Sequence, residues 1–195
     1  MAATPDPSRV SAYVTDAFYE ALVADFTGWQ DDNRAIADPA VREAARAFLE
    51  REARLLDNHL YDAWLGLFAP ECLYWVPGTP QGGDPRAEVA VCLDDRRRLE
   101  DRVFRLRTGA AWSQIPLSRT VRMIANVEPF ASGAEGIVMV RSNLLINEFR
   151  AGEVRALASW CGHRLRRVQG GFEILVKQVN LIQCDQNLRN PSIII

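Results

Sequence analysis

The first part of the chain has its apolar residues at helical spacing. Between positions 10 and 22 one face collects apolar side chains, namely Val10, Tyr13, Val14, Ala17, Phe18, Ala21 and Leu22. Asp6-Pro7 has the form of an N-cap followed by proline at the first helical position, and Gly28 suits a helix end. The pattern predicts an amphipathic helix in this segment.

Two further helices are predicted before residue 70. Asp38-Pro39 repeats the start signal, and the apolar stripe that follows contains Val41, Ala45, Phe48, Glu52, Leu55 and Leu56. Glu52 is the charged member of this stripe, and we expect it at the margin. A third helix, with Trp64 on its core side, is predicted to be capped by Asp57 or Asn58 and to end at Pro70.

Beyond residue 72 the apolar pattern changes to the spacing of strands. A short strand is predicted over 73–76, a glycine- and proline-rich loop over 78–85, a possible strand over 88–93 and a helix over 94–107. Four long strands follow at 119–130, 137–149, 154–168 and 172–184, separated by glycine-containing turns. Strands of this length twist and bend. We therefore expect the α+β class, with a strongly curved antiparallel sheet wrapped over the helices.

Composition narrows the function classes. The formal net charge is −2, which gives no electrostatic reason to expect nucleic-acid binding. Of the 23 basic residues only Lys177 is lysine, a bias that fits either a GC-rich genome or arginines in interfaces. The four cysteines have no metal-type or redox-type spacing, and no signal peptide or membrane-length apolar run is visible. These features favour a cytoplasmic protein.

The sequence lacks ligand sets for iron. A mononuclear non-haem site uses two histidines and a carboxylate, and a Rieske cluster uses two cysteines and two histidines. The chain has only two histidines, His59 and His163. Cys161 and His163 form one C-x-H pair, but no second pair exists to complete a cluster. We therefore assign no catalytic, cofactor-binding or metal-binding residue to this chain.

Other chemical groups are interpreted structurally, with the functional alternative left open. His59 is either a partly exposed residue near a helix start or a general base oriented by Asp57. The tryptophans either fill the core and interfaces or line a pocket. The three isoleucines Ile193, Ile194 and Ile195 are expected to dock against the sheet or another subunit rather than to fray.

Several segments together resemble a known family. The matching segments are Phe48–Asp57 with Tyr61, Trp64 and Leu67–Pro70; Tyr74–Pro77; Leu99–Gly109; Ala111–Pro116; Ser118–Thr120; Ala125–Glu128; Val140–Asn143; and Asn187-Leu188. These motifs are similar to those of the small (beta) subunits of aromatic-ring-hydroxylating dioxygenases. The resemblance covers about residues 46–195, and the segment 99–107 looks closest to the benzoate-type branch.

This resemblance implies a fold, partners and cofactors. The fold is the cone of the nuclear transport factor 2-like (NTF2-like, SnoaL-like) proteins. The function is that of a non-catalytic subunit supporting a terminal oxygenase that dihydroxylates an aromatic substrate, an aromatic carboxylate in the benzoate-type branch. The partners are large (alpha) subunits and other small subunits in an alpha3beta3 hexamer. The Rieske 2Fe-2S cluster and the mononuclear Fe(II) belong to the large subunit.

Two alternatives and one departure accompany this interpretation. The chain could be a free-standing NTF2-like isomerase or dehydratase using Asp57, His59 and Tyr74, or a small-molecule-binding dimer of the same fold. Residues 1–37 form an N-terminal extension, and residues 38–195 form the small-subunit domain. We expect the 10–22 face to dock on the same chain or on the large subunit, so deleting residues 1–30 should weaken the complex.

Overall fold

The computed structural model describes residues 14–80, 82–188 and 192–195. Within this part, a mixed sheet has the strand order β2-β1-β6-β5-β4-β3. The strands are β1 (Phe68–Pro77), β2 (Ala90–Asp95), β3 (Arg119–Ala131), β4 (Ile137–Arg150), β5 (Glu153–Val168) and β6 (Gly171–Leu181). Neighbouring strands are antiparallel except for β1 and β6, which are parallel.

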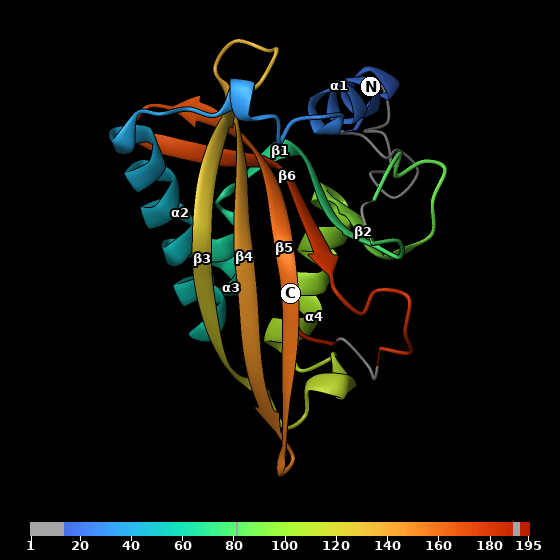
Figure 1. Cartoon of the computed structure of the whole chain (residues 1–195). Coiled ribbons are helices and arrows are strands. Elements are labelled where there is room, and N and C mark those ends of the chain that lie inside the picture. Colours follow the sequence, from blue (N-terminus) through green and yellow to red (C-terminus); the bar gives the residue numbers. More distant parts are fainter. Residues whose placement is uncertain (1–13, 81, 189–191) are drawn as a thin grey trace, which may run out of the picture.

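The helices lie on both faces of the sheet (Figure 1). They are α1 (Asp16–Phe26), α2 (Pro39–Asp57), α3 (Tyr61–Leu65) and α4 (Arg96–Thr108), with short 3-10 turns η2 (Asp32–Arg34) and η3 (Trp112–Gln114). The main core lies between the inner face of the sheet and α2, α3 and α4. Leu22 of α1 packs with Leu73 and Trp75 of β1 on the opposite, outer face. Alternation along β1 explains this, because Cys72, Tyr74 and Val76 join the main core instead.

The predicted four-stranded meander is confirmed, as are the α+β class and the curved sheet. Within the meander the observed bounds follow the predicted ones closely, with the largest difference at β6, which ends at Leu181, whereas β1, predicted over 73–76, begins already at Phe68. Local irregularities shift the register of β3 between Ala125 and Glu128 and of β5 between Arg164 and Leu165. Such bulges bend long strands, which wraps the sheet around α2.

Two predictions about the third helix are wrong. The helix α3 ends at Leu65, and Pro70 lies inside β1, where the pairing with β6 shifts register between Phe68 and Leu73. Proline is tolerated at such an irregularity because it lacks the N–H that a regular ladder requires. The N-cap is Leu60 without a side-chain hydrogen bond. The side chain of Asp57 instead reaches across to β3.

The N-terminal segment docks on its own chain. The helix α1 begins at Asp16 with Thr15 as its N-cap, whereas the predicted Asp6-Pro7 start lies outside the described residues. The carboxylate of Asp25 accepts hydrogen bonds from Arg164 (2.6 Å) and from Ser132 (2.7 Å). Together with the fully buried Leu22, these contacts fix α1 against β5 and the β3–β4 turn.

Candidate functional site

A buried ion pair lies between α2 and β6, inside the curved sheet. Glu52 and Lys177 are each 3% exposed, and Nζ of Lys177 lies 2.8 Å from Oε1 of Glu52. The indole Nε1 of Trp64 donates to the same oxygen at 3.1 Å. Glu52 therefore sits within the core, and the expectation that it lies at the margin of the stripe is wrong.

The environment of Glu52 favours its charged form. Burial opposes ionisation, but the charge and the hydrogen bond of the Lys177 ammonium favour the carboxylate, and the pKa of Glu52 lies well below its ordinary value. The carboxylate is therefore ionised at neutral pH and is neutralised locally by Lys177. A buried charge of this kind is tolerated only while its partner and its hydrogen bonds remain in place.

A buried histidine lies beside this pair. Nε2 of His163 is 3.5 Å from Oε2 of Glu52, and neither ring nitrogen has a hydrogen-bond partner among the described residues. Burial lowers the pKa of His163, and Lys177 adds to this while Glu52 opposes it, so the imidazole is neutral at pH 7. His163 shares a narrow space of about 10 Å³ with Ser142 and Cys161, which is room for about one water molecule.

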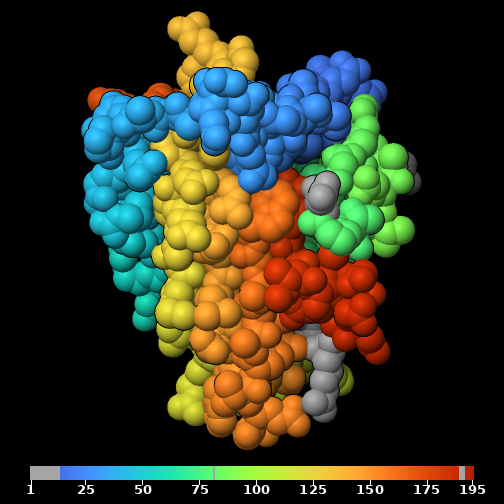
Figure 2. All heavy atoms as spheres, viewed as in Figure 1, coloured from blue at the N-terminus to red at the C-terminus, as the bar shows by residue number. Residues whose placement is uncertain are grey.

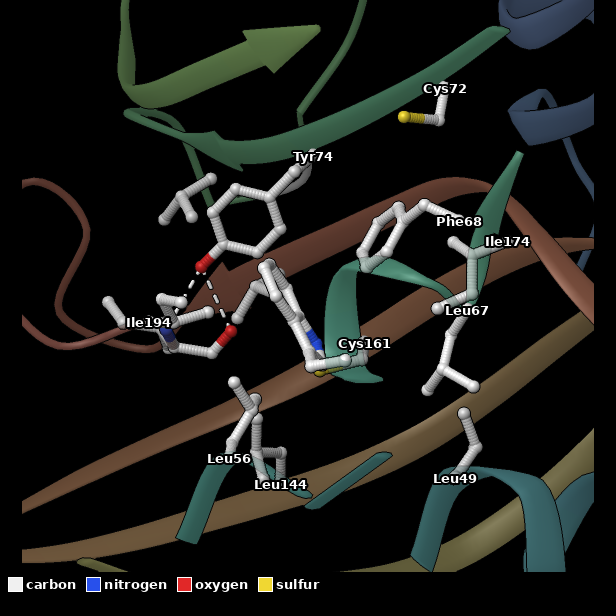
Figure 3. Close-up of a cluster of buried hydrophobic side chains, with 14 of the residues drawn as sticks. Leu49, Leu56, Leu67, Phe68, Cys72, Tyr74, Leu144, Cys161, Ile174 and Ile194 are labelled. Carbon is white, nitrogen blue, oxygen red and sulfur yellow. Dashed lines mark hydrogen bonds between the residues drawn. The ribbon is translucent and has the colours of Figure 1, made fainter. Parts of the chain in front are cut away.

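The segment 193–195 closes the inside of the curved sheet. Ile193, Ile194 and Ile195 are 7%, 3% and 3% exposed and belong to the main core. The hydroxyl of Tyr74 donates to the carbonyl of Ile195 at 2.9 Å and accepts from its backbone N–H at 3.0 Å. Figure 3 shows the Tyr74 hydroxyl pointing toward the part of the core that contains Ile194. The prediction that these isoleucines dock against the sheet is confirmed.

A second anchor holds the same segment. The guanidinium of Arg122 donates to the carbonyl of Ile194 and to the carboxylate of Asp57. Asp57 also accepts from the Thr120 hydroxyl (2.8 Å) and from the Arg122 backbone N–H (2.9 Å). The end of α2, the edge strand β3 and the isoleucine segment are thus joined by one polar network.

The three residues considered for free-standing catalysis do not converge on an open cavity. Tyr74 holds the isoleucine segment directly, and Asp57 does so only through Arg122. His59 is not oriented by Asp57, since its Nδ1 pairs with the Tyr61 hydroxyl at 2.9 Å. Burial also raises the pKa of Tyr74 well above its usual value, which keeps the phenol protonated.

An open groove lies along the sheet beside α2. It has a volume of about 910 Å³ and is lined by residues of α2, β3, β4 and β5. Its walls include Arg54, Arg141 and Trp160, together with Met123 and Ile182, which are 51% and 75% exposed. Figure 2 shows the β3–β4–β5 face open beside α2. A wide hollow with exposed apolar side chains resembles an interaction surface more than an enclosed small-molecule site.

The donor set around Cys161 does not suit iron. Cys161 and His163 line the same narrow space and offer one thiol and one imidazole, and burial raises the pKa of the thiol to about 11. The neighbouring carboxylate of Glu52 is already neutralised by Lys177. Across residues 14–80, 82–188 and 192–195, no group of three or more His, Cys, Asp or Glu residues is placed to hold a metal ion.

Sequence reasoning missed the Glu52–Lys177–His163 cluster. Two signals pointed to it: a carboxylate on an apolar helix stripe, and the sole lysine of an arginine-rich chain within a buried strand. What the sequence did not provide was the pairing that brings α2, β5 and β6 together.

The comparison with protein-family models identifies the chain. The model of the ring hydroxylating beta subunit matches residues 51–186. The chain belongs to the ring-hydroxylating beta-subunit family. This beta subunit is 35% identical over 140 residues to the small oxygenase component of the p-cumate 2,3-dioxygenase system of Pseudomonas putida, covering 70% of the chain and 77% of the relative. It is 45% identical over 140 residues to the small subunit of 2-halobenzoate 1,2-dioxygenase of Burkholderia cepacia, covering 69% and 84%.

Solved structures agree on the fold of this beta subunit. A chain of naphthalene 1,2-dioxygenase superposes with a TM-score of 0.72 at 20% identity, covering 98% of this chain and all of that one. An NTF2-like protein with a cystatin-like fold from Novosphingobium aromaticivorans gives a TM-score of 0.51 at 15% identity, covering 73% and 82%. The predicted NTF2-like cone is confirmed.

In the described residues, no helix is both long and apolar enough to span a bilayer.

Proposed function

We propose that this beta subunit supports the assembly and stability of a terminal oxygenase without carrying out the chemistry itself. The observation that carries the proposal is the filled interior of the cone. The side chains of Ile193, Ile194 and Ile195 fill the inside of the curved sheet, where a ligand would otherwise fit. Hydrogen bonds from Tyr74 and Arg122 hold them in place. Asp57, His59 and Tyr74, the residues considered for acid–base chemistry, are each engaged in contacts within the chain.

The redox centres are proposed to reside in a large-subunit partner. Family membership supports this. We propose three large and three small subunits, and an aromatic carboxylate as the substrate of the complex. The relative that acts on 2-halobenzoate supports that substrate class.

The N-terminal segment is proposed as an extension, residues 1–37, attached to a small-subunit domain, residues 38–195. Contacts of Leu22 and Asp25 with the sheet support a role in stabilising this chain. Deleting residues 1–30 should lower the yield of complex in size-exclusion runs. An unchanged hexamer would argue against a role in assembly.

The test is co-expression of this chain with a large oxygenase subunit. We expect a red-brown complex whose mass, measured by light scattering, fits three copies of each subunit. The purified beta subunit alone should be colourless and inactive toward arenes. A lone dimer that isomerises or dehydrates a small molecule, or that contains stoichiometric iron, would contradict the proposal.

A further inference from the structure

Two polar side chains deep in the core have no partner among the residues that the structure describes. Ser142 of β4 is fully buried, and its hydroxyl bonds to no other described residue. His163 of β5 is 2% exposed, and both of its ring nitrogens are unpaired in the same sense. A buried polar group without a hydrogen bond costs free energy, and native cores contain few of them. The pair therefore points to a further hydrogen-bonding partner at this place.

The sheet brings these two side chains to the same small space. Ser142 lies directly opposite Cys161 in the pairing of β4 with β5. His163 is two residues further along β5, so its side chain is on the same face of the sheet as that of Cys161. All three line a space of about 10 Å³ between the sheet and α2. That volume is at the lower limit for one water molecule and is too small for an organic ligand.

The charged residues around this space are paired with one another. Lys177 and Glu52 both line it, and they form the ion pair at 2.8 Å. Arg122, the other charged residue of its walls, is paired with Asp57. Nε2 of His163 is 3.5 Å from Oε2 of Glu52, which is longer than an ordinary N–H···O hydrogen bond. Because the charges are balanced, the site favours a small neutral ligand that both donates and accepts hydrogen bonds.

The narrow space has a route to solvent. Ala53, Arg122, Ile124 and Leu144 line both this space and the open groove beside α2. The same side chains therefore form the floor of the groove and one wall of the narrow space. Local opening of this layer is enough to exchange a molecule of the size of water with the groove.

We propose that the space is an internal water site, in which one water molecule joins the Ser142 hydroxyl to the ring of His163. Water suits the site because it offers two donors and two acceptors, and a hydroxyl and a neutral imidazole together need both kinds. The Glu52 carboxylate and the Cys161 thiol add a further acceptor and a weak donor on the walls. An internal water with about three hydrogen bonds is a regular part of protein cores. This inference does not depend on the proposed function.

The first test is a crystal structure of the full chain at a resolution that shows other buried water molecules. We expect density for one water within hydrogen-bond distance of Oγ of Ser142 and of one ring nitrogen of His163. An empty space at this place would overturn the proposal. A His163 ring bonded directly to Ser142 or Glu52, with no water between them, would overturn it as well.

The second test uses the sign of a change in stability. If water holds the hydroxyl, Ser142→Ala removes a hydrogen bond and leaves the water one partner short, so Tm should fall by roughly 2–4 °C. If the hydroxyl has no partner, the same change removes an unpaired buried group, and Tm should rise. A rise would overturn the proposal.

Ser159→Ala is the matched control for that measurement. Ser159 is also buried on β5, but its hydroxyl donates to the carbonyl of Leu144 at 3.4 Å, and it is not among the wall residues of the narrow space. Its replacement calibrates the loss that follows when a buried hydroxyl gives up an acceptor within the protein. Ser142→Ala should shift Tm in the same direction as this control; a shift in the opposite direction would contradict the water site.

Discussion

Replacing Lys177 by methionine tests the buried ion pair directly. Methionine keeps most of the side-chain volume but removes the ammonium that lies 2.8 Å from Glu52, leaving a carboxylate that is 3% exposed without a compensating charge. Breaking a buried pair in this way costs ~3–5 kcal/mol. In a domain of this size that loss corresponds to a fall in Tm of roughly 6–20 °C.

The assay is thermal and urea unfolding followed by tryptophan fluorescence, because Trp64 donates to the same carboxylate. A double variant, Glu52→Gln with Lys177→Met, removes both charges and should recover most of the lost stability. Arg46→Met is the control, since Arg46 pairs with Glu43 and Glu50 on the exposed side of α2 and its loss should leave Tm nearly unchanged. A single variant as stable as the parent, or a double variant no better than the single one, would refute the reasoning.

Three further outcomes follow from buried groups. Because burial lowers the pKa of His163, the unfolded chain takes up a proton first, so stability should fall as pH drops below ~6.5, by at most ~1.4 kcal/mol per pH unit from this group. His163→Gln should flatten that slope in pH-dependent urea unfolding; a slope equal to that of the parent would disprove the assignment. Tyr74→Phe strands the N–H and carbonyl of Ile195, and chemical denaturation should show a loss of ~1–3 kcal/mol; no loss would mean that this segment is not held by the phenol. Asp25→Ala should destabilise by ~3–5 kcal/mol and expose α1 to limited proteolysis, whereas resistance equal to the parent would show that α1 is anchored elsewhere.

Local chemistry made much of the fold predictable. Asp38 caps α2 through a 2.8 Å bond to the N–H of Ala40, as the Asp-Pro signal indicates. Gly152 and Gly170, both at positive φ, lie in the turns between the long strands, at the positions that the sequence pattern predicts. These features depend on neighbours in the sequence, and the sequence alone displays them.

Features that depend on distant partners were not predictable. Pro70 is predicted to end a helix, yet it lies in β1, because β1 pairs with β6 on either side of it. The sequence predicts that Asp57 caps the next helix, but its carboxylate instead accepts hydrogen bonds from Thr120 and Arg122 of β3. The sequence places Glu52 at the margin of its helix stripe, because nothing near it in the sequence shows that Lys177 of β6 will be its counter-ion.

The parallel pairing of β1 with β6 has a consequence for how the protein is made. Phe68–Pro77 is complete early in synthesis, but its neighbour on one side, β6, is made after every other described strand. The final anchor, from Tyr74 to Ile195, spans 121 residues. Contacts of such long range are slow to form, and the edge of β1 that pairs with β6 remains unpaired in the meantime. We expect nascent chains to engage chaperones until translation ends, so slower expression at low temperature should raise the yield of folded subunit.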